Sequence, residues 1–178
     1  MVYVFLADGF EEIEALTPID VLRRAQIDVE SIGITGKKVC GAHCICVEAD
    51  KRIDDFNEND VEAIILPGGL KGTQNLDSSD FVKSSVDKAF KDGRLICAIC
   101  AAPMIFGKMG VLQNKKATCY PGFEKYFDNA EYVKEAVVKD GNVITSNGMG
   151  SALEFAFEIV ASIKNKEIAD KIKNEIQY

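Results

Sequence analysis

The sequence has no long apolar run, no basic block and only one histidine. Its longest apolar stretches, at 2–7 and 63–67, are far shorter than the roughly 20 residues that a membrane-spanning helix needs. The N-terminus also lacks the basic start and the cleavable apolar stretch of a signal peptide. These absences predict a soluble cytoplasmic protein with no membrane partner.

The charge balance argues against a nucleic acid as a direct partner. The formal net charge is -7, and no cluster of lysine and arginine interleaves with aromatic residues, so a phosphate backbone would find little to bind. There is no repeat, linker or low-complexity segment. A chain of 178 residues with 47% hydrophobic residues is long enough for one well-packed domain, and we expect a single domain over residues 1–178.

The six cysteines are expected to be reduced thiols, because a disulfide framework is typical of secreted chains. Cys97 and Cys100 have the spacing of a redox pair, but Cys97 is predicted to lie inside a strand with its side chain directed elsewhere. A metal site is a second alternative, with Cys40, His43, Cys44 and Cys46 as ligands. In a strand His43 would point away from the three thiols, so we expect no metal.

Short apolar runs alternate with helical patterns, which is typical of an α/β protein whose mostly parallel sheet has helices on both faces. Thr17 and Pro18 are expected to interrupt and restart the first helix. Ser151 and Glu154 are expected to form a capping box at the start of the helix at 151–163. The expected strands are 2–7, 29–34, 63–66, 94–99, and a pair at 133–138 and 142–145, with a hairpin or edge strand at 39–49.

Ligands of an open parallel sheet bind at the carboxyl ends of its strands, and four segments follow predicted strands there. Gly68 and Gly69 would let backbone amides approach a bound group closely, although a plain turn explains them equally well. Cys100, followed by two alanines, is predicted to stand at a strand-to-helix elbow, where helix amides would lower the pKa of the thiol and make it a nucleophile. Glu14 follows the first strand. Without further context, an acid at this position is explained by the favourable interaction of negative charge with a helix N-terminus.

Four segments together carry a resemblance to a known family. They are "LADGFEEIEALTPIDVLRRA", "AIILPGGLKGTQNL", "LICAICAAPMIF" and "VITSNGMGSALEFAFEIV". In this order they resemble the ThiJ/PfpI superfamily, in the branch that contains a Parkinson-disease-associated protein known as a deglycase, glyoxalase and oxidative-stress chaperone. The resemblance covers residues 2 to about 173.

The resemblance implies a flavodoxin-like sandwich that forms homodimers, with Cys100 and Glu14 as its reactive pair. It implies that the backbone amides of Gly69 and Ala101 face the sulfur or a bound oxyanion. Arg24 matches an arginine that reaches the neighbouring subunit's pocket, with the helix at 18–25 near the interface. Tyr120 stands where relatives often carry a histidine, and Ala42 where they often carry an arginine.

The function implied is a glyoxalase or deglycase that needs no cofactor and acts on small 2-oxoaldehydes such as methylglyoxal, or on glycated adducts. Cys100 would attack the aldehyde, and Glu14 would move a proton between adjacent carbons to give lactate. An alternative uses the same pair as a peroxide sensor, in which an oxidised Cys100 controls chaperone activity or partner binding. A cysteine amidase or protease is a weaker alternative, because His43 is distant from Cys100 in sequence. The sequence does not distinguish the first two.

Overall fold

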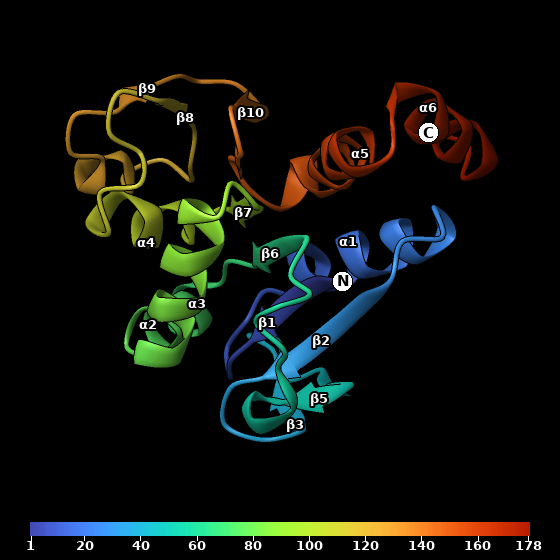
Figure 1. Ribbon diagram of the computed structural model, residues 1–178, viewed down its shortest axis with the longest axis horizontal. Coiled ribbons are helices and arrows are strands. Elements are labelled where there is room, and N and C mark those ends of the chain that lie inside the picture. Colours follow the sequence, from blue (N-terminus) through green and yellow to red (C-terminus); the bar gives the residue numbers. More distant parts are fainter.

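The computed structural model describes residues 1–178, folded as one central sheet between two layers of helices (Figure 1). The seven-stranded sheet has the order β10-β11-β7-β6-β1-β2-β5, and every neighbouring pair is parallel except β10 with β11. Its strands are β1 (Val2–Leu6), β2 (Val29–Gly33), β5 (Lys51–Arg52), β6 (Ala63–Leu66), β7 (Leu95–Ile99), β10 (Val137–Asp140) and β11 (Val143–Ser146). The mostly parallel α/β sandwich that the sequence predicts is confirmed.

Two small sheets complete the strand set. One is the antiparallel hairpin of β3 (Lys38–Cys40) and β4 (Cys46–Glu48), and the other pairs β8 (Lys116–Ala117) with β9 (Glu131–Tyr132). The hairpin lies within the predicted segment 39–49. The turn at Asp140 and Gly141 joins β10 and β11 as an antiparallel pair, as expected.

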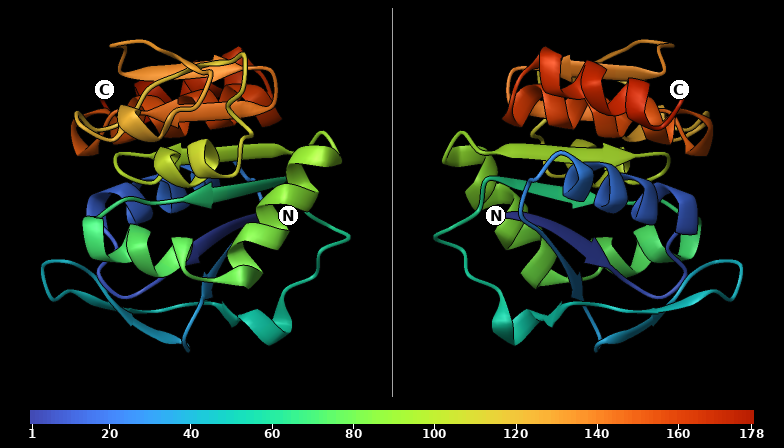
Figure 2. Two further views of the ribbon diagram at one scale, coloured as in Figure 1. Left: turned by 90° about the vertical axis from the view of Figure 1, so that its left-hand side faces the viewer. Right: turned by 90° about the vertical axis from the view of Figure 1, so that its right-hand side faces the viewer.

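The helices divide between the two faces of the sheet. Figure 2 shows α1 (Glu12–Arg24), α5 (Ala152–Ile163) and α6 (Lys166–Glu175) on one face, and α2 (Leu70–Asp77), α3 (Asp80–Lys91) and α4 (Pro103–Lys108) on the other. Short 3-10 turns occur at Ile53–Asp55, Glu124–Tyr126 and Met149–Ser151. No helix has both the length and the apolar character needed to cross a bilayer.

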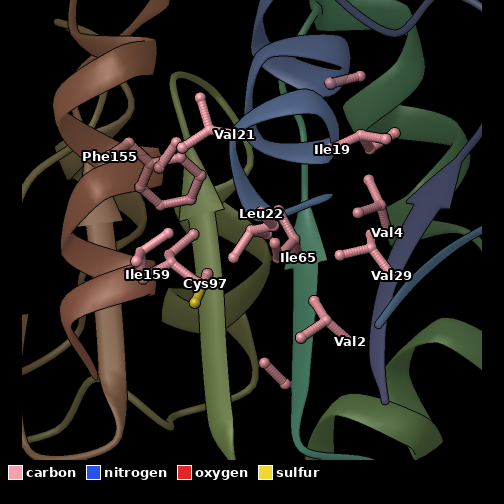
Figure 3. Close-up of a cluster of buried hydrophobic side chains, with 14 of the residues drawn as sticks. Val2, Val4, Ile19, Val21, Leu22, Val29, Ile65, Cys97, Phe155 and Ile159 are labelled. Atoms are coloured by element: carbon pink, nitrogen blue, oxygen red, sulfur yellow. The ribbon is translucent and has the colours of Figure 1, made fainter. Parts of the chain in front are cut away.

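Both faces of β1 are buried, which explains its continuous apolar sequence. Val2 and Val4 point into the core under α1 and α5, where Leu22 and Phe155 pack (Figure 3), while Tyr3 and Phe5 point into the core on the opposite face. The neighbouring strands β11, β7, β6 and β1 are parallel, so their carboxyl ends lie side by side along one edge of the sheet.

Two local predictions about helices are wrong. Helix α1 runs without a break from Glu12 to Arg24 with Pro18 inside it. Proline removes one backbone hydrogen bond, and the packing of the helix against α5 and the sheet compensates for that loss. That lost bond would have gone to the carbonyl of Glu14. Ser151 makes no capping bond; its hydroxyl instead contacts Ser146, Asn147 and Gly148.

The expectation that all six cysteines are free thiols is also wrong. Cys40 and Cys46 form a disulfide, while Cys44, Cys97, Cys100 and Cys119 are free. The two bonded residues are direct partners in the β3–β4 register, so strand pairing brings their side chains together. With these two sulfurs bonded to each other, the four-ligand metal alternative is lost.

Candidate active site

Cys100 occupies a sharp elbow immediately after β7. Its backbone has a φ of 64°, a left-handed conformation that is uncommon for residues other than glycine. Neighbouring loops hold it there: its N–H donates to the Ser146 carbonyl at 2.9 Å, and its carbonyl accepts from the Tyr120 N–H at 2.7 Å. A non-glycine residue held in this conformation is typical of functional sites, where the surrounding structure supports the strain.

Two backbone amides, those of Gly69 and Ala101, lie near the Cys100 sulfur and act to lower the pKa of its thiol. Gly69 begins α2 with a φ of 84°, and a Cβ built there would lie 2.4 Å from the Gly9 carbonyl oxygen. Only glycine fits this backbone at this approach. The two amides predicted from the sequence thus lie near the sulfur, one in the β6–α2 turn and one at the elbow.

Glu14 lies in the first turn of α1 and is 1% exposed. Its Oε2 atom accepts a hydrogen bond from the Gly68 N–H at 2.9 Å. The Cys100 side chain and the Met149 N–H lie near the carboxyl group and act to lower its pKa. A Cβ built on Gly68 would lie 2.4 Å from Glu14 Oε2 and 2.6 Å from Cys100 Cβ. Gly68 therefore lies so close to both Glu14 and Cys100 that it has no room for a side chain.

The protonation of this pair differs from the sequence-based expectation of a thiol with a lowered pKa. Burial, followed by the negative charge of Glu14, raises the pKa of Cys100 to about 12, although the amides of Gly69 and Ala101 act in the opposite direction. Burial raises the pKa of Glu14 to about 7. Near neutral pH the pair therefore holds a thiol beside a carboxyl that is poised to accept or donate a proton.

Tyr120 lies on the rim of the site. Its side chain is 52% exposed, and its ring approaches Gly148, where an added Cβ would lie 3.6 Å from Tyr120 Cδ2. Beside it a hollow of about 610 Å³ is lined by Tyr120, Met149, Lys134 and Glu124 among others. Tyr120 thus lines this hollow, and its backbone N–H donates to the Cys100 carbonyl.

Two other residues considered from the sequence lie away from the reactive pair. Arg24, ten positions after Glu14 on α1 and so about 15 Å along the helix axis, pairs with Asp20 through a 2.8 Å Nε–Oδ2 contact. Cys97 is fully buried in the core between the sheet and α5, free of any disulfide. The redox pair of Cys97 with Cys100 is not formed.

Sequence reasoning missed one polar contact beside the site. Glu12 is buried, and its two carboxylate oxygens contact His43, through the backbone N–H at 2.7 Å and through Nδ1 at 2.9 Å. Glu11 completes a group of three possible metal ligands with these two residues. The oxygens of Glu12 are already engaged by His43, and a Glu11 oxygen accepts the Glu14 N–H. The acid-rich start of α1 was the only signal of this cluster in the sequence.

Known proteins resemble the chain over nearly its whole length. Residues 1–162 match the model of the DJ-1/PfpI family. The Parkinson disease protein 7 homolog of Danio rerio is 38% identical, over 96% of this chain and 93% of that protein. The DJ-1 homolog B of Arabidopsis thaliana is also 38% identical, over 98% of this chain but only 41% of that protein. A protein named as a deglycase in Pyrococcus abyssi is 28% identical, over 92% of this chain and 99% of that protein.

The fold matches a solved structure equally well. The crystal structure of Drosophila melanogaster DJ-1beta superposes with a TM-score of 0.94 at 36% identity, covering 99% of this chain and 97% of the other. The α/β sandwich is thus that of a solved DJ-1 structure. On this evidence the chain belongs to the DJ-1/PfpI family.

Proposed function

We propose that the protein is a cysteine-dependent enzyme of the glyoxalase or deglycase type, acting on small 2-oxoaldehydes or their adducts without a cofactor. The observation that carries the proposal is the contact of the Cys100 thiol with a buried carboxyl, that of Glu14, whose pKa is raised to about 7. A base with a pKa near the working pH is best suited to proton transfer. The deglycase name of the Pyrococcus relative supports the same class of reaction.

In the first step, the Glu14 carboxylate accepts the thiol proton while the Cys100 sulfur bonds to the aldehyde carbon. The carbonyl π bond breaks, and its oxygen takes the proton, which gives a hemithioacetal. The amides of Gly69 and Ala101 are the donors available to stabilise the negative charge that develops on this oxygen. The high pKa of the resting thiol makes the base necessary, because little thiolate exists at neutral pH.

In the second step, Glu14 removes the proton from the former aldehyde carbon to give an enediol. Glu14 then returns a proton to the neighbouring carbon, while the hydroxyl proton on the former aldehyde carbon passes to the neighbouring oxygen. This converts the hemithioacetal of methylglyoxal to the thioester of lactate. Water then hydrolyses the thioester, releasing lactate and restoring the thiol. The sum is one aldehyde and one water converted to one lactate, with no external oxidant or reductant.

The direct test is to incubate the purified protein with methylglyoxal and to follow lactate. Cys100→Ser and Glu14→Gln are expected to abolish or nearly abolish the activity, while Cys44→Ser, which changes an exposed free thiol, serves as the matched control. Absence of lactate with the unmodified protein, or full activity in Cys100→Ser, would disprove the proposal.

A peroxide-sensing role is the second candidate, favoured by the donors around the sulfur. A sulfinate on Cys100 could accept hydrogen bonds from Gly69, Ala101 and a protonated Glu14. Peroxide treatment of a Cys44→Ser variant should then produce a stable sulfinate at Cys100, detected by mass spectrometry, while the buried Cys97 and Cys119 stay unmodified. Equal oxidation of all remaining thiols would contradict this role.

We further propose that the protein acts as a homodimer. Three exposed apolar side chains, Ile13, Leu16 and Ile45, lie on the first half of α1 and on the β3–β4 hairpin tip, which contacts Glu12 through His43. An exposed apolar patch of this kind is typical of an interface. The patch involves the first half of α1 rather than residues 18–25, where the exposed side chains include Asp20 and Arg24.

A further inference from the structure

The β3–β4 hairpin contains three of the six cysteines. Cys40 and Cys46 are joined by the disulfide, and Cys44 lies in the turn between them as an exposed free thiol. Cys46 is exposed and Cys40 is half-buried. In the single chain, solvent and small solutes can therefore reach this disulfide, unlike the buried thiols of Cys97 and Cys119. Accessible disulfides exchange with small thiols, whereas buried ones resist them.

The hairpin tip is attached to the segment that leads into α1. The Cys40 carbonyl accepts the Gly9 N–H at 2.7 Å, and the Cys40 N–H donates to Asp8 Oδ1 at 2.9 Å. Further along the tip, the Ala42 N–H donates to the Phe10 carbonyl at 2.8 Å, and His43 contacts Glu12. Every residue of the tip from 40 to 43, except the tightly packed Gly41, thus bonds to residues 8–12.

The same segment supports the reactive pair from its other side. The Glu11 N–H donates to the Gly68 carbonyl at 3.0 Å, and the Glu11 carboxylate accepts the Glu14 N–H at 2.8 Å. The Gly9 carbonyl accepts the Gly72 N–H at 3.0 Å. Residues 9–12 therefore connect the hairpin by hydrogen bonds to Glu14 and to the turn that carries Gly68 and Gly69.

Beyond the pairing of β3 with β4 and the disulfide, two backbone hydrogen bonds close the tip on itself. The Gly41 N–H donates to the Ile45 carbonyl at 2.9 Å, and the Cys44 N–H donates to the Gly41 carbonyl at 3.2 Å. Cys44 has a φ of 65°, which is unfavourable for a side-chain-bearing residue. The cross-link removes conformations that the open loop could otherwise adopt, so opening it is expected to loosen the tip and the segment 8–12 with it.

We propose that Cys40 and Cys46 form a reversible redox modification site, oxidised by peroxides and reduced by low-molecular-weight thiols, whose state controls how firmly Glu14 is held. In the oxidising direction, one peroxide molecule takes two electrons and two protons from the two thiols, giving the disulfide and two molecules of water. In the reducing direction, a small thiol attacks one sulfur to form a mixed disulfide. A second thiol then releases it as the small-molecule disulfide and restores both protein thiols.

This site is separate from oxidation of Cys100, since neither of its sulfurs belongs to the reactive pair. The closed form is the more active one, because the hairpin then holds the segment that orients the base. Cys44 offers a neighbouring thiol for exchange with either sulfur, without net oxidation or reduction. A Cys44→Ser variant removes this exchange and leaves a simple two-cysteine couple.

The experiment equilibrates the Cys44→Ser protein anaerobically in glutathione buffers of graded ratio, then measures the oxidation state of Cys40 and Cys46 by differential alkylation and mass spectrometry. We expect the disulfide to open within the range that the buffers span. Amide hydrogen exchange of residues 9–14 should be at least about threefold faster in the reduced form, and aldehyde turnover at least about threefold slower. The double variant Cys40→Ser, Cys46→Ser should resemble the reduced form in every buffer.

Two results would overturn the proposal: a disulfide that stays closed in excess reduced glutathione, or equal hydrogen exchange of residues 9–14 in both redox states. The titration and the exchange measurement use the protein without cysteine changes at 40 and 46, so they stand even if the double variant does not fold. They also require no substrate. If both behave as expected while no form turns over aldehyde, the proposed enzymatic function fails and the redox site remains.

Discussion

The backbone N–H of Gly68 donates a 2.9 Å hydrogen bond to Glu14 Oε2 across 54 positions of sequence. This bond joins the β6–α2 turn to the first turn of α1, and a Cβ added at Gly68 would lie 2.6 Å from Cys100 Cβ. The glycine thus brings three chain segments within contact distance.

Gly68→Ala is expected to destabilise the protein by about 1–3 kcal/mol, as is usual when atoms are added to a packed interior, and to reduce aldehyde turnover strongly. The new Cβ would lie 2.4 Å from Glu14 Oε2 and 2.9 Å from the Ile99 carbonyl oxygen. Gly150→Ala is the matched control, because a Cβ there meets nothing within 4 Å. Chemical denaturation and lactate formation measure both effects, and equal behaviour of the two variants would contradict the packing argument.

Glu14→Gln is expected to change how stability depends on pH. The pKa of Glu14 is raised from 4.5 to about 7 by burial, so between these values the folded protein holds a proton that the unfolded chain has released. The stability of the unmodified protein therefore falls as pH rises through this window, by up to about 3 kcal/mol. The variant lacks this titration and should gain relative stability from pH 5 to pH 8.

Urea denaturation at several pH values and one fixed protein concentration would measure this difference. A constant difference in unfolding free energy between the two proteins across the window would show that the carboxyl of Glu14 does not titrate as described.

Tyr120→Phe and Glu14→Gln separate the contributions of the phenol and the carboxyl. Tyr120 is half exposed at the rim, where its hydroxyl can supply one hydrogen bond to a substrate oxygen; losing a bond worth about 1.4 kcal/mol would slow turnover about tenfold. Loss of a positioned acid or base costs about a hundredfold or more. Both changes are nearly isosteric, so steady-state lactate kinetics compare them directly. Full loss in Tyr120→Phe with little loss in Glu14→Gln would reverse the assigned roles.

Leu16→Asp is expected to convert the protein from dimer to monomer at micromolar concentration. A charge at Leu16, one of the three exposed apolar residues proposed for the interface, would be buried there without a partner. Tyr178→Asp introduces the same charge at another exposed apolar residue, and should leave the dimer intact. Light scattering or sedimentation provides the measurement; a monomeric unmodified protein would disprove the dimer.

The sequence by itself determined those features that depend on local pattern. Continuous apolar runs at 2–6 and 63–66 predict central strands because both faces of each are buried. Two alanines after Cys100 predict the elbow because only small residues allow the bend, and Gly68 with Gly69 predicts close backbone approach because no Cβ intervenes. The prediction that Glu14 and Cys100 act as partners came from the resemblance to the family.

The tertiary structure alone decided what depends on neighbours from distant parts of the chain. The pKa of Cys100 is raised rather than lowered because the elbow is buried beside Glu14, and burial is a property of the assembled layers. Helix α1 continues through Pro18 because α5 and the sheet pack against it. Cys40 and Cys46 become a disulfide, and His43 a partner of Glu12, only after β3 and β4 pair and the hairpin folds onto α1. Local propensity acts over a few residues, whereas these contacts join segments that the chain brings together only by folding.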